Sequence, residues 1–260
     1  MAKIIDIDNE PCSIWIKINS GTKCQFRIIA EDLKPNSKYA DRTINVDGIR
    51  EIYLSFPVTP KKLKLSIFCL SNRSQVFDAS IEKRPLTTYE IWIDTNTKQF
   101  LQLAIPFSQI CGFEPPSVLG RVFQSKNKQF NIKYFPDIKD YMTGKYMNTP
   151  SRIGHNTGII EVAANKFIPY TIPMRMMILL HEFSHKWKNP QINLPISSET
   201  GADVNALYIY LGMGFSKVDA IFVYANVFLK SQSPGNQERM RKIMNYIQGF
   251  ENEEYAKRIS

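Results

Sequence analysis

The sequence predicts an α+β fold in which a β-rich half, residues 1–108, is followed by a mainly helical half with a small sheet, residues 109–260. Two observations support this division. Apolar and polar residues alternate through much of the first hundred residues, as they do in half-buried strands. After about residue 170 the apolar residues recur every three or four positions, as they do along one side of a helix. We therefore expect two domains.

Six strand-like segments are expected in the first half. The clearest places Ile14, Ile16 and Ile18 on one face of a strand. Short polar segments such as Val46-Asp47-Gly48 favour turns between the strands. Short strands without helices between them predict a small antiparallel β-sandwich or barrel. The expected strands are residues 13–18, 23–30, 50–56, 62–69, 75–81 and 89–94.

The second half is expected to begin near Pro115-Pro116 and Gly120, where the alternating pattern stops. Pro173 suits the first turn of a helix, and Ser216 followed by Asp219 resembles a helix-capping pair. These signals predict two strands followed by four helices. The strands are residues 129–135 and 157–164, and the helices are residues 173–187, 198–211, 216–228 and 237–248.

Composition and charge exclude several classes of protein. The net charge is +9, but the basic residues are scattered and do not form the aromatic-interleaved clusters that bind nucleic acid, so no specific nucleic-acid partner is expected. No apolar run approaches the roughly 20 residues of a membrane-spanning helix, and the first residues lack the apolar core of a secretion signal. The four cysteines form no Cys-x-x-Cys pair. We expect a cytoplasmic protein with reduced thiols.

The sequence His-Glu-Phe-Ser-His at residues 181–185 is the strongest chemical signal. His181 and His185 lie four residues apart in a predicted helix, so both imidazoles face the same side and can bind one metal ion. Glu182 lies about 100° around the helix axis from His181, within reach of a water on that ion. A carboxylate there can act as the general base for hydrolysis.

A third ligand is expected on the following helix. Glu199 is the nearest downstream candidate, if the chain turns at Pro190 and Pro195. Asp203 lies one helical turn later and can accept the second ring N–H of a ligating histidine. The alternative, in which Asp203 is the third ligand and Glu199 points away, remains open.

The two segments His-Glu-Phe-Ser-His and Glu-Thr-Gly-Ala-Asp together resemble the HExxH and ExxAD motifs of the gluzincin zinc metallopeptidases. This resemblance extends over roughly Lys126 to Ile247. It implies a zincin-like domain and a Zn²⁺ cofactor. It also implies a role for each matching residue: zinc ligands at His181, His185 and Glu199, the general base at Glu182, and a contact from Asp203 to a ligating histidine. Some families place a histidine where this chain has Ser233, which leaves that residue's role in doubt.

Several other residues are weaker candidates. The segment from Thr157 to Ala163 could be the sheet-edge strand that pairs with a substrate, or an ordinary core strand. Tyr208 or Tyr210 could stabilise an oxyanion, although core packing is the safer interpretation of each. His155 could border the site, and Arg239 could tie the last helix to it.

These observations predict a zinc-dependent endopeptidase that acts on a protein or peptide substrate. The N-terminal β domain has no chemical motif and is expected to position the enzyme or to bind a protein partner. The alternative is a structural or assembly protein, for example a virion component, whose zincin-like domain cleaves only during maturation or not at all.

Overall fold

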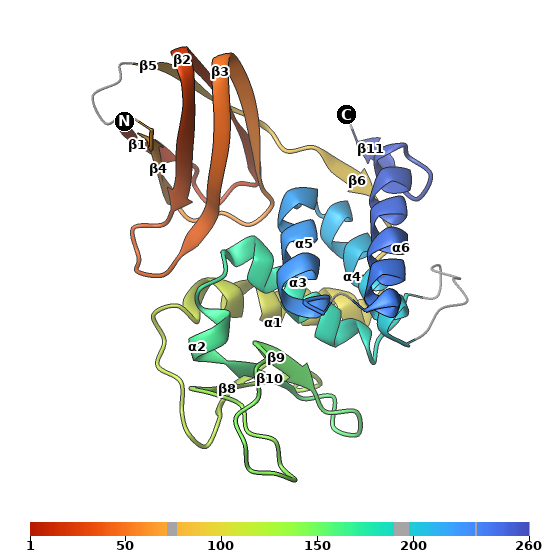
Figure 1. Cartoon of the computed structure of the whole chain (residues 1–260). Helices are drawn as coiled ribbons and strands as arrows, with labels where there is room; N and C mark the ends of the chain where they lie inside the picture. Colours follow the sequence, from red (N-terminus) through yellow and green to blue (C-terminus); the bar gives the residue numbers. More distant parts are fainter. Residues whose placement is uncertain (72–76, 190–197, 232, 260) are drawn as a thin grey trace.

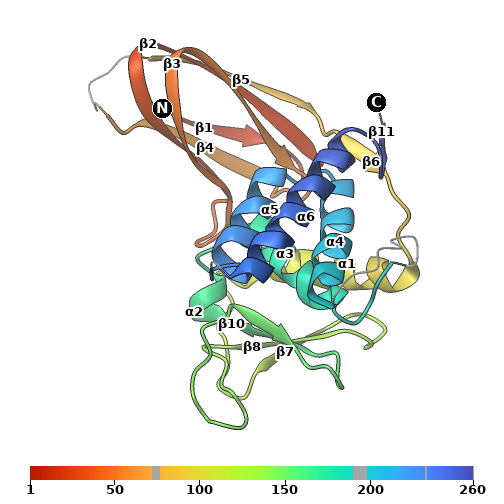
Figure 2. The ribbon, with the colours of Figure 1, turned by 45° about the vertical axis from the view of Figure 1, so that its right-hand side comes forward.

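The computed structural model describes residues 1–71, 77–189, 198–231 and 233–259. A β-rich region lies at one end, the helices occupy the middle, and a smaller sheet lies at the other end (Figure 1). Figure 2 shows the same three levels from a second direction. The molecule thus combines helices with mainly antiparallel sheets, as the sequence predicts. Among the described residues, no helix has the length and apolar character needed to cross a bilayer.

The N-terminal region is one open antiparallel sheet, so the expected sandwich or barrel is wrong. Strand β2 is twenty residues long and pairs with β3 along most of its length, with β5 along its first half and with β4 along its second half. The outer edges of the sheet do not meet. The strands are β1 (Ala2–Asp6), β2 (Cys12–Glu31), β3 (Lys38–Phe56), β4 (Lys62–Cys69) and β5 (Phe77–Pro85).

Strand β3 continues, with a bulge beside it, through a turn that the sequence pattern predicts. The expected turn at Val46-Asp47-Gly48 lies inside β3, where Gly48 pairs with Ser20 and has a positive φ of 71°. The register between β2 and β3 shifts between Ser20 and Cys24. Because glycine tolerates this conformation, the strand bends there without ending. The expected strand at residues 75–81 lies partly outside the described residues.

After the N-terminal sheet, the described residues contain six α-helices, one π-helix and a four-stranded sheet. In this sheet β10 pairs parallel with β8 and antiparallel with β9. The strands are β7 (Arg121–Gln124), β8 (Asn131–Phe135), β9 (Ser151–Ile153) and β10 (Ile160–Ala163), and a separate pair joins β6 (Thr88–Glu90) to β11 (Lys257–Ile259). The helices are α1 (Thr95–Ile110), α2 (Ala164–Phe167), α3 (Ile172–Ser184), α4 (Ser198–Gly212), α5 (Lys217–Val223) and α6 (Pro234–Glu251), with the π-helix η1 at Tyr224–Phe228.

Helix α1 is absent from the sequence expectation, which places a strand at residues 89–94. The strand stops at Glu90, and the Asp94 carboxylate accepts the Thr97 N–H to cap the helix. The same residue types favour turns and helix caps, which explains the error. The expected division between residues 108 and 109 falls inside α1, and the two-domain division stays a prediction.

Two arginines connect the N-terminal sheet to the helices. The Arg42 guanidinium lies 2.5 Å from the Asp219 carboxylate of α5. Arg175 of α3, 1% exposed, donates to the carbonyl oxygens of Asn36, Ser108 and Ile168. Since Ser108 lies in the last turn of α1, the cation also meets the negative end of that helix.

Candidate metal centre

Helix α3 is the central helix of the site. All of its residues are buried, including the polar Arg175, His181, Glu182 and Ser184. Pro173 lies in the first turn, as expected, but the helix ends at Ser184, three residues earlier than expected. His185 still has helical φ and ψ angles of −63° and −29°. Its side chain therefore keeps the helical spacing from His181.

His181, His185 and Glu199 converge on one point. The two Nε2 atoms lie 3.1 Å apart, and the Glu199 carboxylate oxygens lie 3.8 Å from His181 Nε2 and 3.7 Å from His185 Nε2. One ligand atom from each residue fits within 4.8 Å of the others. Two ligands at about 2.1 Å from a tetrahedral ion would be about 3.4 Å apart. The three groups therefore fit one small metal ion with only slight movement. The expected turn at Pro190 and Pro195 lies outside the described residues.

Asp203 lies on the far side of the His181 ring and is fully buried. Its Oδ1 is 3.0 Å from His181 Nδ1, which is a contact of hydrogen-bond length. A carboxylate at Nδ1 favours the tautomer that leaves the Nε2 lone pair free for a metal. The structure thus places Glu199 beside both Nε2 atoms and Asp203 behind His181.

Arg239 of α6 joins the two acidic residues. Its guanidinium donates three hydrogen bonds to the Asp203 carboxylate, from Nε to Oδ2 at 3.0 Å and from Nη2 to Oδ1 at 3.0 Å and to Oδ2 at 2.8 Å, and it lies 3.2 Å from Glu199 Oε2. This balances part of the negative charge that burial of Asp203 would otherwise leave unpaired. The last helix is therefore tied to the cluster.

The π-helix adds two contacts that sequence reasoning missed. The Phe228 ring stacks on His181 with a centroid distance of 3.9 Å, and the buried Tyr224 hydroxyl donates to the Asp203 carbonyl oxygen. The wider turn of a π-helix changes the direction of its side chains relative to an α-helix, and such turns are frequent at functional sites. The apolar spacing alone contains no signal for it.

Glu182 is 7% exposed and is held by strand β9. It accepts a 2.9 Å hydrogen bond from the Ser151 hydroxyl and a further bond from the Ile153 N–H. Strand β9 is the outermost strand of its sheet, whereas β10 is paired on both sides. The substrate-pairing role for Thr157 to Ala163 is therefore wrong, because the strand part of that segment, Ile160–Ala163, has no open edge and is an interior strand. The open edge beside Glu182 belongs to β9.

Burial and neighbouring charges move the pKa values of three residues. Burial lowers the pKa of His181, but Asp203, Glu182 and Glu199 outweigh it, so this pKa is raised. Burial also raises the pKa of Glu182, against the opposing effects of His181 and Ser151. Burial and the neighbouring His181 lower the pKa of His185, which keeps that imidazole neutral and available as a ligand. A raised pKa suits a carboxylate that accepts a proton near neutral pH.

The end of α3 is fixed by polar contacts. Asn205 of α4 donates to Ser184 Oγ at 2.7 Å and to the Trp187 carbonyl oxygen at 3.2 Å. The loop that connects β9 and β10 packs against the same end, where a side chain at Gly158 would lie 2.8 Å from the Trp187 ring. His155 is exposed on this loop and contributes to the lowered pKa of His185, so it lies in the vicinity of the cluster.

The remaining candidates have other partners. The Tyr208 hydroxyl accepts the Trp92 N–H, and the buried Tyr210 ring stacks on Phe215. Neither of these contacts involves the cluster. Ser233 caps α6 by accepting the Asn236 N–H.

Comparison with known proteins identified no relative of this chain. No family model, curated protein or solved structure matches this chain.

Proposed function

We propose that the chain is a zinc-dependent endopeptidase of the gluzincin type. The observation that carries this proposal is the convergence of His181 Nε2, His185 Nε2 and a Glu199 oxygen on one point. Two neutral imidazoles and one carboxylate form a ligand set used by catalytic zinc sites, which leave a position for water or substrate. Glu199 is 50% exposed, so this side of the cluster is open to solvent.

The chemistry of the donor set fits zinc. Imidazole nitrogen suits Zn²⁺, and a set without thiolates or several carboxylates disfavours both iron–sulfur and calcium binding. When bound, zinc would lower the pKa of a coordinated water and polarise a peptide carbonyl.

Each protein group then has a defined task. Glu182 takes a proton from the attacking water and passes it to the leaving amine. Ser151 and the Ile153 N–H hold the Glu182 carboxylate in place. Asp203 orients His181, and Arg239 holds Asp203 and Glu199 together. The open edge of β9 offers main-chain groups to an extended peptide, which would bring a peptide bond alongside Glu182.

The test is a pair of measurements on the purified protein. We expect one equivalent of zinc by elemental analysis and cleavage of unfolded casein or of a mixed peptide library. Glu182→Gln should retain zinc and lose at least about a hundredfold in cleavage rate, since a general base contributes about 10²- to 10⁴-fold. Glu238→Gln, an exposed acid on α6, is the matched control and should cleave normally.

Two results would contradict the proposal. Continued cleavage by Glu182→Gln would exclude Glu182 as the general base. Failure of the wild-type chain to retain zinc would exclude a zinc site at His181, His185 and Glu199. One equivalent of zinc without cleavage of any library peptide would instead favour the structural or assembly role.

A further inference from the structure

A second candidate binding site lies on the face of the small sheet that points away from the metal cluster. Consecutive residues of β9 project to opposite faces. Ser151 contacts Glu182 on one face, whereas Arg152 contacts Glu161 of β10 on the other. A pocket of about 430 Å³ opens on this second face, within the size range of small-molecule sites. It is separate from the metal cluster.

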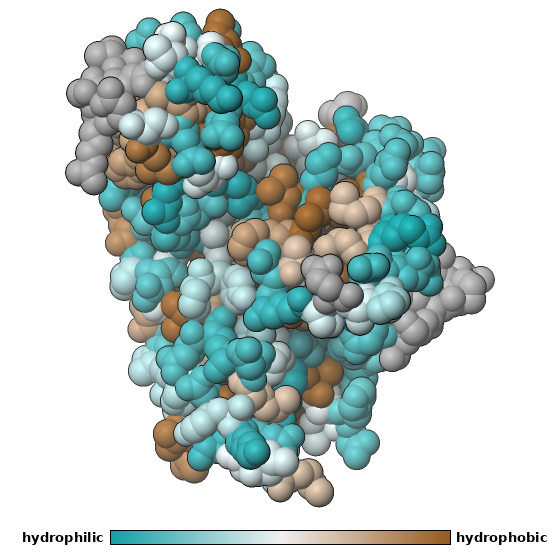
Figure 3. All heavy atoms as spheres, in the orientation of Figure 1, coloured by the Kyte–Doolittle hydropathy of each residue, from teal (hydrophilic) through white to brown (hydrophobic). Residues whose placement is uncertain are grey.

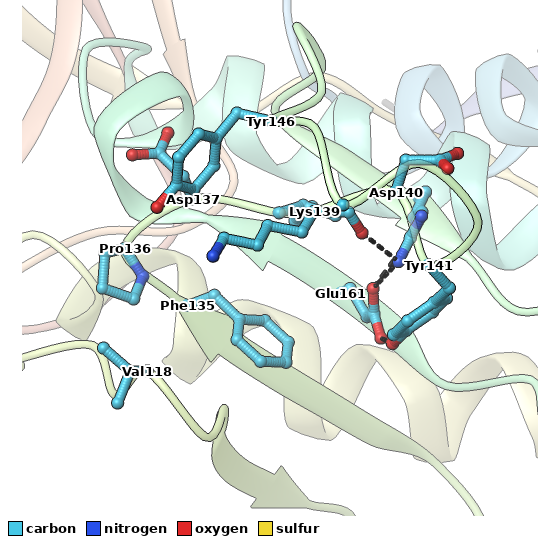
Figure 4. Close-up of a pocket in the computed structure, with 12 residues that line it drawn as sticks. Val118, Phe135, Pro136, Asp137, Lys139, Asp140, Tyr141, Tyr146 and Glu161 are labelled. Carbon is cyan, nitrogen blue, oxygen red and sulfur yellow. Dashed lines mark hydrogen bonds and ion pairs between the residues drawn. The ribbon is translucent and has the colours of Figure 1, made fainter.

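The pocket has an apolar part and a polar part. Figure 4 shows Val118, Phe135 and Pro136 on one side and Tyr146 on the other, with the Lys139 side chain extending between them. The opposite end holds Glu161 with its hydrogen-bonding partners. The residues that line the pocket are Val118, Phe135, Pro136, Asp137, Ile138, Lys139, Asp140, Tyr141, Gly144, Tyr146, Arg152 and Glu161.

The polar end is already fixed by internal contacts. Arg152 donates to Glu161 at 2.8 Å and to the Lys139 carbonyl oxygen at 3.0 Å, and it contacts Met147 Sδ. The Tyr141 hydroxyl also donates to Glu161. These bonds attach residues 139–147 to the sheet, so the pocket is formed before any ligand enters.

The carboxylates around the pocket have partners, whereas the Lys139 ammonium lacks an ionic one. Asp137 pairs with Lys166 at 2.9 Å, and Asp140 accepts the Met142 and Thr143 N–H groups of its own turn. In the described part of the chain, no carboxylate lies within 4.0 Å of Lys139 Nζ, which rests 4.9 Å from the centre of the Tyr146 ring. This cation is available to a ligand.

Large apolar side chains surround the opening. Val118 is 83% exposed and Tyr146 66%, and both line the pocket. Leu119 and Met142, at 86% and 94%, adjoin it in sequence. Brown and tan spheres interrupt the hydrophilic surface at the lower end of the molecule (Figure 3). Such exposure is costly unless something covers it, and it marks binding sites.

We infer that this pocket binds a small anion with an apolar body, namely an aromatic or aliphatic carboxylate. The carboxylate lies against the Lys139 ammonium, and the apolar body lies along the side of the pocket formed by Val118, Phe135 and Pro136. A cationic ligand is disfavoured because Lys139 already occupies the face of Tyr146. This inference does not depend on the proposed peptidase activity.

Binding of 2-naphthoate tests the inference, with 2-naphthamide and 2-naphthylmethylammonium as neutral and cationic analogues. Titration calorimetry of the full chain should detect binding of the carboxylate, and the two analogues should bind at least about tenfold more weakly, the size of effect expected for one charge-assisted hydrogen bond. Lys139→Met should weaken naphthoate binding to a similar degree. Lys145→Met changes an exposed lysine outside the lining and should leave binding unchanged.

A second pair of variants tests the apolar part. Val118→Asp places a negative charge in the lining and should abolish naphthoate binding, whereas Leu119→Asp, equally exposed but outside the lining, should not. Both positions are exposed, so folding should persist and can be checked by circular dichroism. Equal binding of the three probes, no binding of any, or unchanged binding in Lys139→Met would overturn the inference.

Discussion

The N-terminal sheet and the helical region bury different kinds of polar group. Within residues 1–71 and 77–85 the buried polar side chains are all hydroxyls, namely Ser20, Ser37, Thr59 and Ser66. The helical region buries ionisable groups, among them Arg175, His181, Glu182, Asp203 and Asp219. Burying an ionisable group costs several kcal/mol unless it is paired. Apolar packing is therefore enough to specify the sheet. The helical region also contains a set of buried ionisable groups that apolar packing does not require.

The largest expected effect on stability comes from Arg175, which contributes to both regions. Arg175→Met keeps much of the volume but leaves three buried carbonyl groups without their donor. We expect a loss of about 3 kcal/mol in the free energy of unfolding, measured by urea denaturation. Arg27→Met, at a side chain 43% exposed, is the control and should lose about 1 kcal/mol or less. Equal losses would show that burial of this cation is not what joins the regions.

Asp203→Asn tests whether the buried charges serve the metal. The amide keeps the shape but loses the negative charge beside His181 and Arg239. We expect zinc affinity to fall about ten- to a hundredfold, measured by competition with a chelator. Asp219→Asn removes a comparable buried carboxylate that pairs with Arg42, away from the cluster. Asp219→Asn should lower the stability of the fold and leave zinc affinity unchanged. A loss of zinc affinity in both variants would point to general unfolding.

Asp41 offers a pH-dependent test within the sheet. The Arg27 and Lys38 side chains lower the pKa of this carboxyl to about 2, from an unfolded value of about 3.9. The carboxylate therefore stabilises the fold above about pH 4, and this contribution is lost as the pH falls towards 2. At pH 7 the free energy of unfolding of Asp41→Asn should be about 1 kcal/mol lower than that of the wild type, a value already reduced by solvent screening of Arg27. Near pH 2 only a small fraction of this difference should remain. Unfolding curves at both values check this.

An effect similar in size to that of Asp41→Asn is expected from a core substitution in the sheet. Ile16→Val removes one buried methylene from a fully buried side chain, which costs about 1 kcal/mol. Thermal denaturation measures the change. Because the sheet is stabilised by packing, zinc content and cleavage should be unaffected. Altered zinc content would show that the two regions are coupled more closely than their contacts indicate.

Much of the site could be predicted from the sequence because its residues follow helical spacing. His181 and His185 are held together by one helix, and Glu199 and Asp203 by the next, so local geometry fixes most of the arrangement. Ser151 and Phe228 could not be predicted, because their positions depend on how distant elements pack. No local pattern specifies such contacts.

The fold was predictable to the level of strands and helices but not of their pairing. The alternation that identifies β2 is visible in Ile14, Ile16 and Ile18, yet it contains no information on whether the sheet closes. Helix α1 was hidden by the turn-like cap at Asp94 and by Pro106, a residue that usually interrupts helices. Which strands pair, and whether a helix accepts a proline such as Pro106, both depend on the tertiary structure.

The alternation along β9 restricts how the loop before it can change length. Ser151 and Arg152 are neighbours that serve opposite faces of the sheet. A displacement of the strand by one residue would place either Arg152 beside Glu182 and Ile153 beside Glu161, or Pro150 beside Glu182 and Ser151 beside Glu161. Insertions between Asp140 and Pro150 are therefore compatible with the fold only when the loop absorbs them and the parity of β9 is preserved.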